Sequence, residues 1–175
     1  LTNGVAFAVM MMTPADLEDF AVGFALTEGI VESAGDLRSL RFAETADGFV
    51  VNLTLDPAHL ARSEDRRRTL AGRAGCGICG AQTIEAALRP PSRVSGAVPG
   101  RDALLRAYDI LPAAQVMNRA NRSTHAAAYC DRTGVIEFLR EDIGRHNALD
   151  KLAGALARQG RTRGEGHAYL RRSLP

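Results

Sequence analysis

Two pairs of β-rich runs constrain the fold of this 175-residue chain more than any other feature of its sequence. Residues 37–44 and 49–55 flank a short turn that contains Gly48, and residues 126–130 and 135–139 flank a second glycine-containing turn. Runs rich in β-forming residues on both sides of such a turn are typical of a β-hairpin. The sequence therefore predicts two hairpins that lie far apart along the chain.

The chain before the first hairpin predicts a short buried strand and then a helix. Residues 5–12 form an apolar run of strand length, although periodicity alone does not exclude a helix there. Thr13 is expected to act as the N-cap, with Pro14 at the first helical position. Gly29 follows the last apolar residues at helical spacing and is expected to end the helix.

Two further helices are predicted on either side of the second hairpin. Residues 102–110 have helical character after a loop rich in proline and glycine. Asp142 is expected to cap the helix that follows the hairpin, and Gly160 is expected to end it. The expected buried stripe of that helix consists of Leu149, Leu152, Ala153 and Leu156.

The charge balance excludes functions that depend on a strongly charged surface. The chain has 22 basic and 20 acidic residues, a formal net charge of +2, which is too small to favour nucleic acid binding. No apolar run approaches the roughly 20 residues that span a bilayer, and we expect no leader peptide before the predicted fold. Three cysteines, two of them close together, fit a reducing compartment. We therefore expect a cytoplasmic protein that binds neither nucleic acid nor membrane.

Cys76 and Cys79 form a CxxC pair whose surroundings favour thiolate chemistry. Neighbouring glycines allow a tight, exposed turn. If the chain from Ala81 onward is helical, the pair lies at a helix N-terminus, where the macrodipole favours a thiolate over a thiol. A thiolate attacks a persulfide or disulfide sulfur, and a second cysteine resolves or protects the product. Four arginines before the pair act in the same direction: Arg66, Arg67, Arg68 and Arg73.

Other interpretations of the cysteines stay open. One CxxC supplies half of a tetrahedral zinc site, and the remaining candidate ligands, Cys130, His125 and His146, have unfavourable spacing. A thioredoxin-like redox role needs a strand-to-helix turn within a βαβ unit, which the glycine-rich surroundings do not favour. Cys130 by itself is more typical of a small core residue than of a nucleophile.

A second candidate site lies within residues 140–151, where ionisable side chains gather at the start of a predicted helix. Residues 144–147 would present backbone amides to a phosphate, with Arg145 supplying charge and His146 a proton donor. The alternative is a capped surface helix with ordinary ion pairs. The arginine run before the cysteines is likewise either a solvated helix face or a patch that faces an anion. His125, in an apolar strand, is by default a half-buried histidine.

Four segments, in this order, resemble the formate dehydrogenase accessory sulfurtransferase family. They are TPADLEDFAVGFALTEGI (13–30), RRRTLAGRAGCGICG (66–80), THAAAYC (124–130) and REDIGRHNALDKL (140–152). The likeness spans nearly all of residues 8–160. GCGICG together with EDIGRHNALDK is a specific combination, whereas a single CxxC is not.

The resemblance implies a sulfurtransferase that accepts sulfane sulfur from a cysteine desulfurase. It implies delivery of that sulfur to the molybdenum bis-molybdopterin guanine dinucleotide cofactor, bound as a substrate, which formate dehydrogenase requires. The family's persulfide carrier corresponds to Cys76, with Cys79 as its partner. No permanently bound metal is expected, and intact members are expected to form homodimers. The residues expected to bind the cofactor are Arg73, Thr124, His125, Asp142, Arg145 and His146.

The resemblance also implies an α/β fold. The implied fold is a sandwich similar to that of cytidine deaminase, preceded by a β-rich segment. Deaminase chemistry is not expected, because this sequence lacks the HxE pattern that a zinc deaminase needs. We expect a β-rich segment with one helix at 1–70, a partial α/β core with the CxxC loop at 71–160, and an atypical, disordered tail at 161–175. Nothing after Gly160 resembles the family, which predicts a fold that is incomplete at its C-terminus. A zinc- or nucleotide-binding module without sulfur transfer, and an inactive truncated fragment, are the alternatives.

Overall fold

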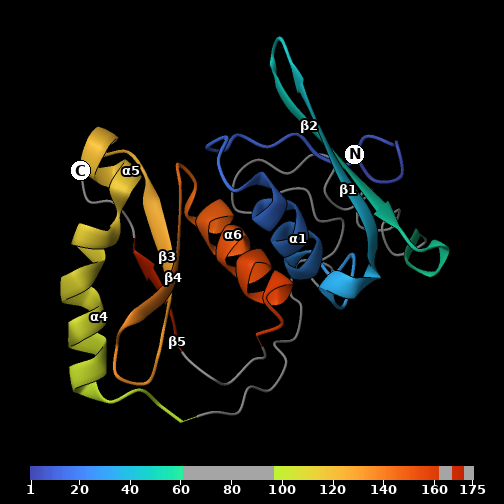
Figure 1. The fold of residues 1–175 in the computed structure, drawn as a ribbon. Helices are drawn as coiled ribbons and strands as arrows, with labels where there is room; N and C mark the ends of the chain where they lie inside the picture. The colour runs from blue at the N-terminus through green and yellow to red at the C-terminus, as the bar shows by residue number, and fades with distance from the viewer. Residues whose placement is uncertain (61–96, 162–166, 172–175) are drawn as a thin grey trace, which may run out of the picture. The chain divides into compact units, whose positions relative to one another are not determined.

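A computed structural model describes residues 1–60, 97–161 and 167–171 of the chain, which form parts of two compact units. The described residues of the first unit are 1–10 and 28–60, and the second unit has the remainder (Figure 1). Helix α1 (Leu17–Thr27) belongs to the second unit and not, as we expected, to the N-terminal β-rich segment. The expected boundary at residue 70 lies outside the described residues.

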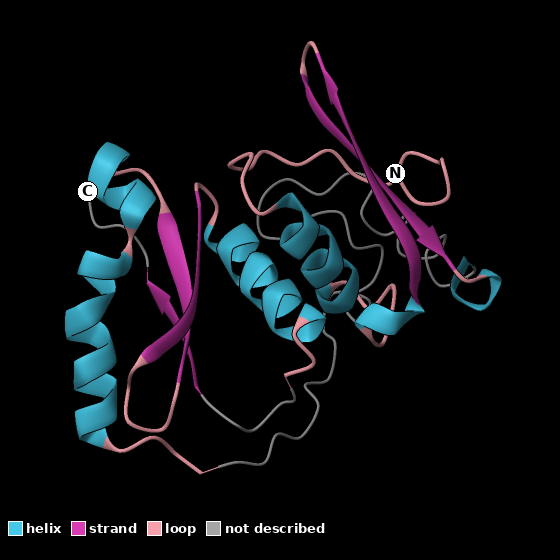
Figure 2. Cartoon of the chain, in the orientation of Figure 1, coloured by secondary structure: helices cyan, strands magenta, loops and turns pink. Residues whose placement is uncertain are grey.

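The first unit is built on the predicted N-terminal hairpin. Strands β1 (Leu37–Thr45) and β2 (Gly48–Leu55) pair in antiparallel register, with Thr45 opposite Gly48 across a two-residue loop (Figure 2). Gly48 has a φ of +143°, a backbone conformation that other residues avoid. A 3₁₀ turn, η1 (Ala34–Asp36), precedes β1. The prediction of this hairpin is confirmed.

The prediction of a strand at residues 5–12 is wrong. The backbone there is irregular, and the side chains of Val9 and Met11 are 97% and 83% exposed. No neighbouring strand pairs with this segment among the described residues. Instead, the carbonyl oxygen of Met11 accepts a hydrogen bond from the side chain of Asn147, so a tertiary contact fixes the end of the run.

The described residues of the second unit form a three-stranded antiparallel sheet in the order β4-β3-β5. Strands β3 (His125–Cys130) and β4 (Ile136–Asp142) form the predicted second hairpin, and β5 (His167–Arg171) pairs with the other edge of β3. The expectation of a disordered tail is therefore wrong for these five residues. Strand β5 forms here because the edge of β3 opposite β4 supplies backbone hydrogen-bond partners. The sequence pattern of the tail does not reveal these partners.

Helices cover both faces of this sheet. Helix α4 (Arg101–Ala114) lies on one face and α6 (Arg145–Arg158) on the other (Figure 1). Alternate residues of β3 face opposite ways: Ala128 packs with Leu111 of α4, whereas Ala127 packs with Leu152 of α6. The central strand is thus buried on both sides, and the unit has the mixed α/β architecture that the family resemblance implies.

The helix boundaries differ in detail from those predicted. Helix α4 extends past the expected residues 102–110 and contains Pro112, and a short helix α5 (Val116–Asn121) follows it. On α6, Leu152 is buried as expected but Leu149 is 38% exposed, and the buried set includes Asn147 and Lys151. A polar network, described below, takes the place of part of the expected apolar stripe. No helix in the described ranges is long and apolar enough to span a bilayer.

Two glycines bring α1 and α6 into close contact. A Cβ atom added to Gly23 of α1 would lie 1.7 Å from the carbonyl oxygen of Asp150, and one added to Gly154 of α6 would lie 1.8 Å from that of Asp19. The two backbones therefore cross at a distance that only glycine permits. Helix α1 starts at Leu17, later than the predicted cap at Thr13, because Thr13 is engaged with the turn after β4.

Candidate functional site

The turn that joins β4 to α6 carries the second candidate site. Gly144, and not Asp142 as expected, is the N-cap residue of α6, and Arg145 and His146 are exposed in the first helical turn. The N-terminus of a helix presents amide N–H groups and the positive end of the helix dipole. The turn thus combines two exposed side chains that can carry positive charge with a favourable local field for an anion.

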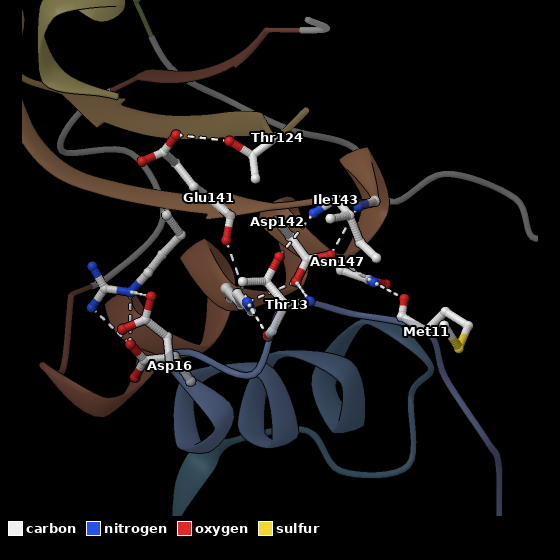
Figure 3. A network of polar contacts seen from close by, with 12 residues as sticks. Met11, Thr13, Asp16, Thr124, Glu141, Asp142, Ile143 and Asn147 are labelled. Carbon is white, nitrogen blue, oxygen red and sulfur yellow. Dashed lines mark hydrogen bonds and ion pairs between the residues drawn. The ribbon is translucent and has the colours of Figure 1, made fainter. Parts of the chain in front are cut away.

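Asp142 is the hub of a buried hydrogen-bond network beneath this turn (Figure 3). Its side chain is fully buried, and both carboxylate oxygens accept hydrogen bonds. Oδ1 accepts from the Gly144 N–H at 2.8 Å and from the Asn147 side-chain amide at 3.0 Å, and Oδ2 accepts from the Thr13 N–H at 3.0 Å. Both oxygens of the Asp142 carboxylate are therefore hydrogen-bonded to donors of the protein itself.

Lys151 neutralises this buried carboxylate. Its Nζ lies 2.7 Å from Asp142 Oδ2, and both side chains have no exposed surface. The same ammonium donates to the carbonyl oxygens of Thr13 at 3.0 Å and of Glu141 at 3.3 Å. Lys151 is the only lysine in the chain, and its three donors all have a partner.

Residues 11–13 form a strap, held against the turn from both ends. The Asn147 side-chain amide donates to the Met11 carbonyl oxygen at 2.9 Å, and the Ile143 N–H donates to Thr13 Oγ1 at 3.1 Å. Figure 3 shows the strap passing below the end of β4, with Thr13 directed at Asp142. The hydroxyl predicted to cap α1 is used in this tertiary contact, which explains the later start of the helix.

Glu141 organises the neighbouring end of the sheet. Its buried carboxylate accepts from the N–H groups of Met117 and Asn118, both at 2.8 Å, and from Thr124 Oγ1 at 3.0 Å. An acidic side chain at these amides stabilises the N-terminus of α5. Thr124 is therefore buried and bonded, while His125, the next residue, is half-buried and its backbone lies opposite Asp142 in the sheet register.

Ion pairs hold the first turn of α1 in place. The buried Asp19 carboxylate accepts from Arg140 at 2.7 Å and from Arg158 at 2.6 Å, and Arg158 also binds Glu18. Arg140, which belongs to the second candidate site in the sequence, is engaged in these contacts. Its role is to hold α1 against β4 and α6.

The predicted site residues thus separate into groups. Arg145 and His146 are exposed, His125 is half-buried, and Thr124 and Asp142 are buried within hydrogen-bond networks. Sequence reasoning placed Asn147 in the predicted 144–147 cradle but missed its side-chain contacts, and it missed Thr13 and Lys151. The spacing of Asn147 and Lys151, one helical turn apart, was the signal that they share a face. The remaining predicted residues, Arg73, Cys76 and Cys79, lie outside the described residues.

Cys130 has no features of a reactive cysteine. It is 1% exposed and packs with Ala107 and Leu111 of α4, as the core interpretation predicts. Burial, together with the carboxylates of Asp131 and Glu137, raises the pKa of its thiol from 9.0 to about 11. In the described parts of the chain no three histidine, cysteine or acidic residues are grouped so that they could hold a metal ion.

We therefore expect Cys130 to stay unmodified when folded protein is treated with iodoacetamide at pH 8, because only a thiolate attacks. The Cys130 thiol ionises at a lower pH in the unfolded chain than in the folded one. The contribution of the buried neutral thiol to folding stability is therefore complete below pH 9 and is lost as the pH rises toward about 11. Mass spectrometry with and without urea measures the modification. Labelling of Cys130 at the same rate in both conditions would contradict its burial.

Comparison with known proteins gives one consistent family. The sequence profile of the FdhD/NarQ family matches residues 1–171, so the likeness continues past Gly160, where we expected none. A sulfur carrier protein FdhD from Xanthomonas euvesicatoria pv. vesicatoria (strain 85-10) is 51% identical over 157 residues, covering 89% of this chain and 56% of the relative. Another, from Bordetella petrii, is 46% identical over 158 residues, covering 90% and 57%. The chain thus spans little more than half the length of these relatives.

A solved structure has the same fold. It is the crystal structure of a protein assigned as a formate dehydrogenase accessory protein from Desulfotalea psychrophila, with a TM-score of 0.60 and 19% identity over 97% of this chain and 58% of that one. At this identity the likeness concerns the fold alone. Together with the profile match over residues 1–171, the described architecture leads to one conclusion: the chain belongs to the FdhD/NarQ family.

Proposed function

We propose that this chain carries sulfur as a persulfide on Cys76, with Cys79 as its partner, and transfers it to the molybdenum bis-molybdopterin guanine dinucleotide cofactor. The proposed donor is a cysteine desulfurase, and the loaded cofactor is destined for formate dehydrogenase. Family membership supports this proposal most strongly, since relatives at 51% and 46% identity are named sulfur carrier proteins. The CxxC within GCGICG supplies the sulfur chemistry.

The proposed transfer is an exchange between sulfur atoms. A Cys76 thiolate attacks the terminal sulfur of the donor persulfide, the S–S bond of the donor breaks, and the donor cysteine leaves as a thiolate. The new S–S bond on Cys76 holds the sulfane sulfur at the same oxidation level, so no external oxidant is needed. The glycines and arginines that neighbour the pair in the sequence are expected to favour this reaction, because such residues allow an exposed turn and stabilise an ionised thiol.

The turn between β4 and α6 is the proposed contact for the acceptor. The cofactor carries phosphate groups, and Arg145 and His146 are exposed where the α6 dipole is positive. An arginine fork binds phosphate through paired hydrogen bonds. The half-buried His125 is a further proposed contact. Arg73, which lies outside the described residues, is another.

We expect incubation with a cysteine desulfurase and cysteine to add the mass of one sulfur atom to the tryptic peptide of residues 74–93, which contains Cys76 and Cys79. The Cys76→Ser variant is expected to lose the adduct. Cys130, in the separate peptide of residues 123–132, is the internal control and is expected to stay unmodified because it is buried. An unmodified 74–93 peptide in the wild-type chain would reject the proposed function.

The setting of this reaction follows from its chemistry. A free CxxC pair persists where thiols are kept reduced, so the cytoplasm is the proposed location. A homodimer is the proposed assembly, on the basis of the family resemblance. Both concern the whole protein, of which this chain matches little more than half the length in its relatives.

A further inference from the structure

The buried network beneath the β4–α6 turn contains more polar groups than helix capping requires. Asp142, Asn147 and Lys151 are all at least nine-tenths buried, and none of the three side chains can reach a ligand outside without rearrangement. Their hydrogen bonds go to the strap, to the turn, to one another and, from Lys151, to the Glu141 carbonyl oxygen at the end of β4 (Figure 3). A network of this kind acts through the residues that it holds.

We propose that Thr13, Asp142, Asn147 and Lys151 are positioning residues that present Arg145 and His146 to an anionic ligand. This inference rests on the proposed function, which places the phosphates of the acceptor at the same turn. It reassigns Asp142, which we predicted from the sequence as a cofactor contact, to a role beneath the site. The occupied oxygens and the complete burial of its carboxylate carry that reassignment.

Two hydrogen bonds fix the backbone of the turn immediately before the exposed side chains. The Ile143 N–H donates to Thr13 Oγ1, and the Gly144 N–H donates to Asp142 Oδ1. Asn147, in the first turn of α6, then ties the helix to both Asp142 and the strap. The chain is thus held on both sides of Arg145 and His146, which limits the directions that these two side chains can take.

Lys151 has a second effect, on the local field. Without it, Asp142 would be a buried negative charge close to the amides of the turn, where it would repel an anion. The ion pair at 2.7 Å cancels that charge while leaving the hydrogen bonds of the carboxylate in place. With Lys151 in place, the turn is held by the Asp142 hydrogen bonds and still favours an anion.

The test uses guanosine diphosphate, the nucleotide portion of the proposed acceptor, as the probe in calorimetric titration. Thr13→Val removes the acceptor of the Ile143 N–H, and Asn147→Ala removes two hydrogen bonds, so each is expected to weaken binding about tenfold. Thr13→Ser keeps the hydroxyl and is expected to restore wild-type affinity. Arg158→Gln is the matched control, since it breaks ion pairs of the same helix away from the turn, and it is expected to bind normally.

The Arg145→Ala variant distinguishes a failure of the positioning role from a failure of the proposed acceptor site. If Arg145→Ala weakens binding while Thr13→Val and Asn147→Ala bind like the wild type, the positioning role is overturned and the proposed site stands. If Arg158→Gln weakens binding as much as Thr13→Val at equal loss of thermal stability, the effect is general destabilisation and the positioning role is again overturned. If the wild type does not bind the probe, or Arg145→Ala binds it normally, the proposed acceptor site fails and the positioning role fails with it.

Discussion

Gly154→Ala is expected to destabilise the second unit by about 3 kcal/mol or more. The new Cβ would lie 1.8 Å from the Asp19 carbonyl oxygen and 2.7 Å from the Gly23 nitrogen, both of which are backbone atoms of α1. Backbone atoms cannot turn aside as a flexible side chain can, so α1 and α6 would have to separate. Separation would loosen their packing and the ion pairs that Asp19 makes with Arg140 and Arg158.

The sign of this effect makes the prediction specific. In an exposed helix interior, replacing glycine by alanine stabilises a protein by roughly 0.5–1 kcal/mol, because glycine loses more backbone entropy on folding. Gly23→Ala is expected to behave like Gly154→Ala, since its Cβ would lie 1.7 Å from the Asp150 carbonyl oxygen. Gly100→Ala is the control, because among the described residues no atom other than those of Gly100 and its chain neighbours lies within 4 Å of its added Cβ. Urea unfolding of the three variants measures the differences, and equal stabilities would contradict the close crossing.

Lys151→Met is expected to cost about 3–5 kcal/mol of folding stability, the range found when one partner of a buried ion pair is removed. Methionine has a similar length but leaves Asp142 as a buried carboxylate without a counter-charge. It also removes the donor that reaches the carbonyl oxygens of Thr13 and Glu141. Chemical unfolding followed by circular dichroism measures the loss.

A double variant shows whether the uncompensated charge is the cause. Lys151→Met combined with Asp142→Asn removes both charges, and we expect it to be more stable than Lys151→Met alone. Arg38→Met is the contrasting case, because its ion pair with Asp56 is exposed and its loss is expected to change stability little. A Lys151→Met variant as stable as Arg38→Met would contradict the burial of the Lys151–Asp142 pair.

Local signals predicted the two hairpins correctly for a physical reason. Each strand pair is joined by a short turn, so its register follows from residues that are close in sequence. Gly29 and Gly160 have φ values of +68° and +66° just after α1 and α6, as their predicted role in ending helices requires. These features need no information from distant parts of the chain.

Other predictions failed where a distant partner decided the outcome. Thr13 has the residue type of an N-cap, but its hydroxyl accepts from Ile143, 130 residues away. The apolar run at residues 5–12 has the length of a strand, yet no edge pairs with it in the described structure. The arginine- and glycine-rich tail reads as disordered, although β5 forms within it because β3 offers a free edge.

The amino-acid sequence alone determined the family, the presence of the CxxC pair, and the elements stabilised by neighbouring residues. Only the tertiary structure decided which ionisable residues of the 140–151 segment face solvent and which are buried. Arg145 and His146 are exposed, whereas Asp142 and Lys151 form a buried pair that depends on a strap more than 120 residues earlier in the chain. Charge and spacing along one helix cannot distinguish these cases, because burial depends on what the rest of the chain places against that helix.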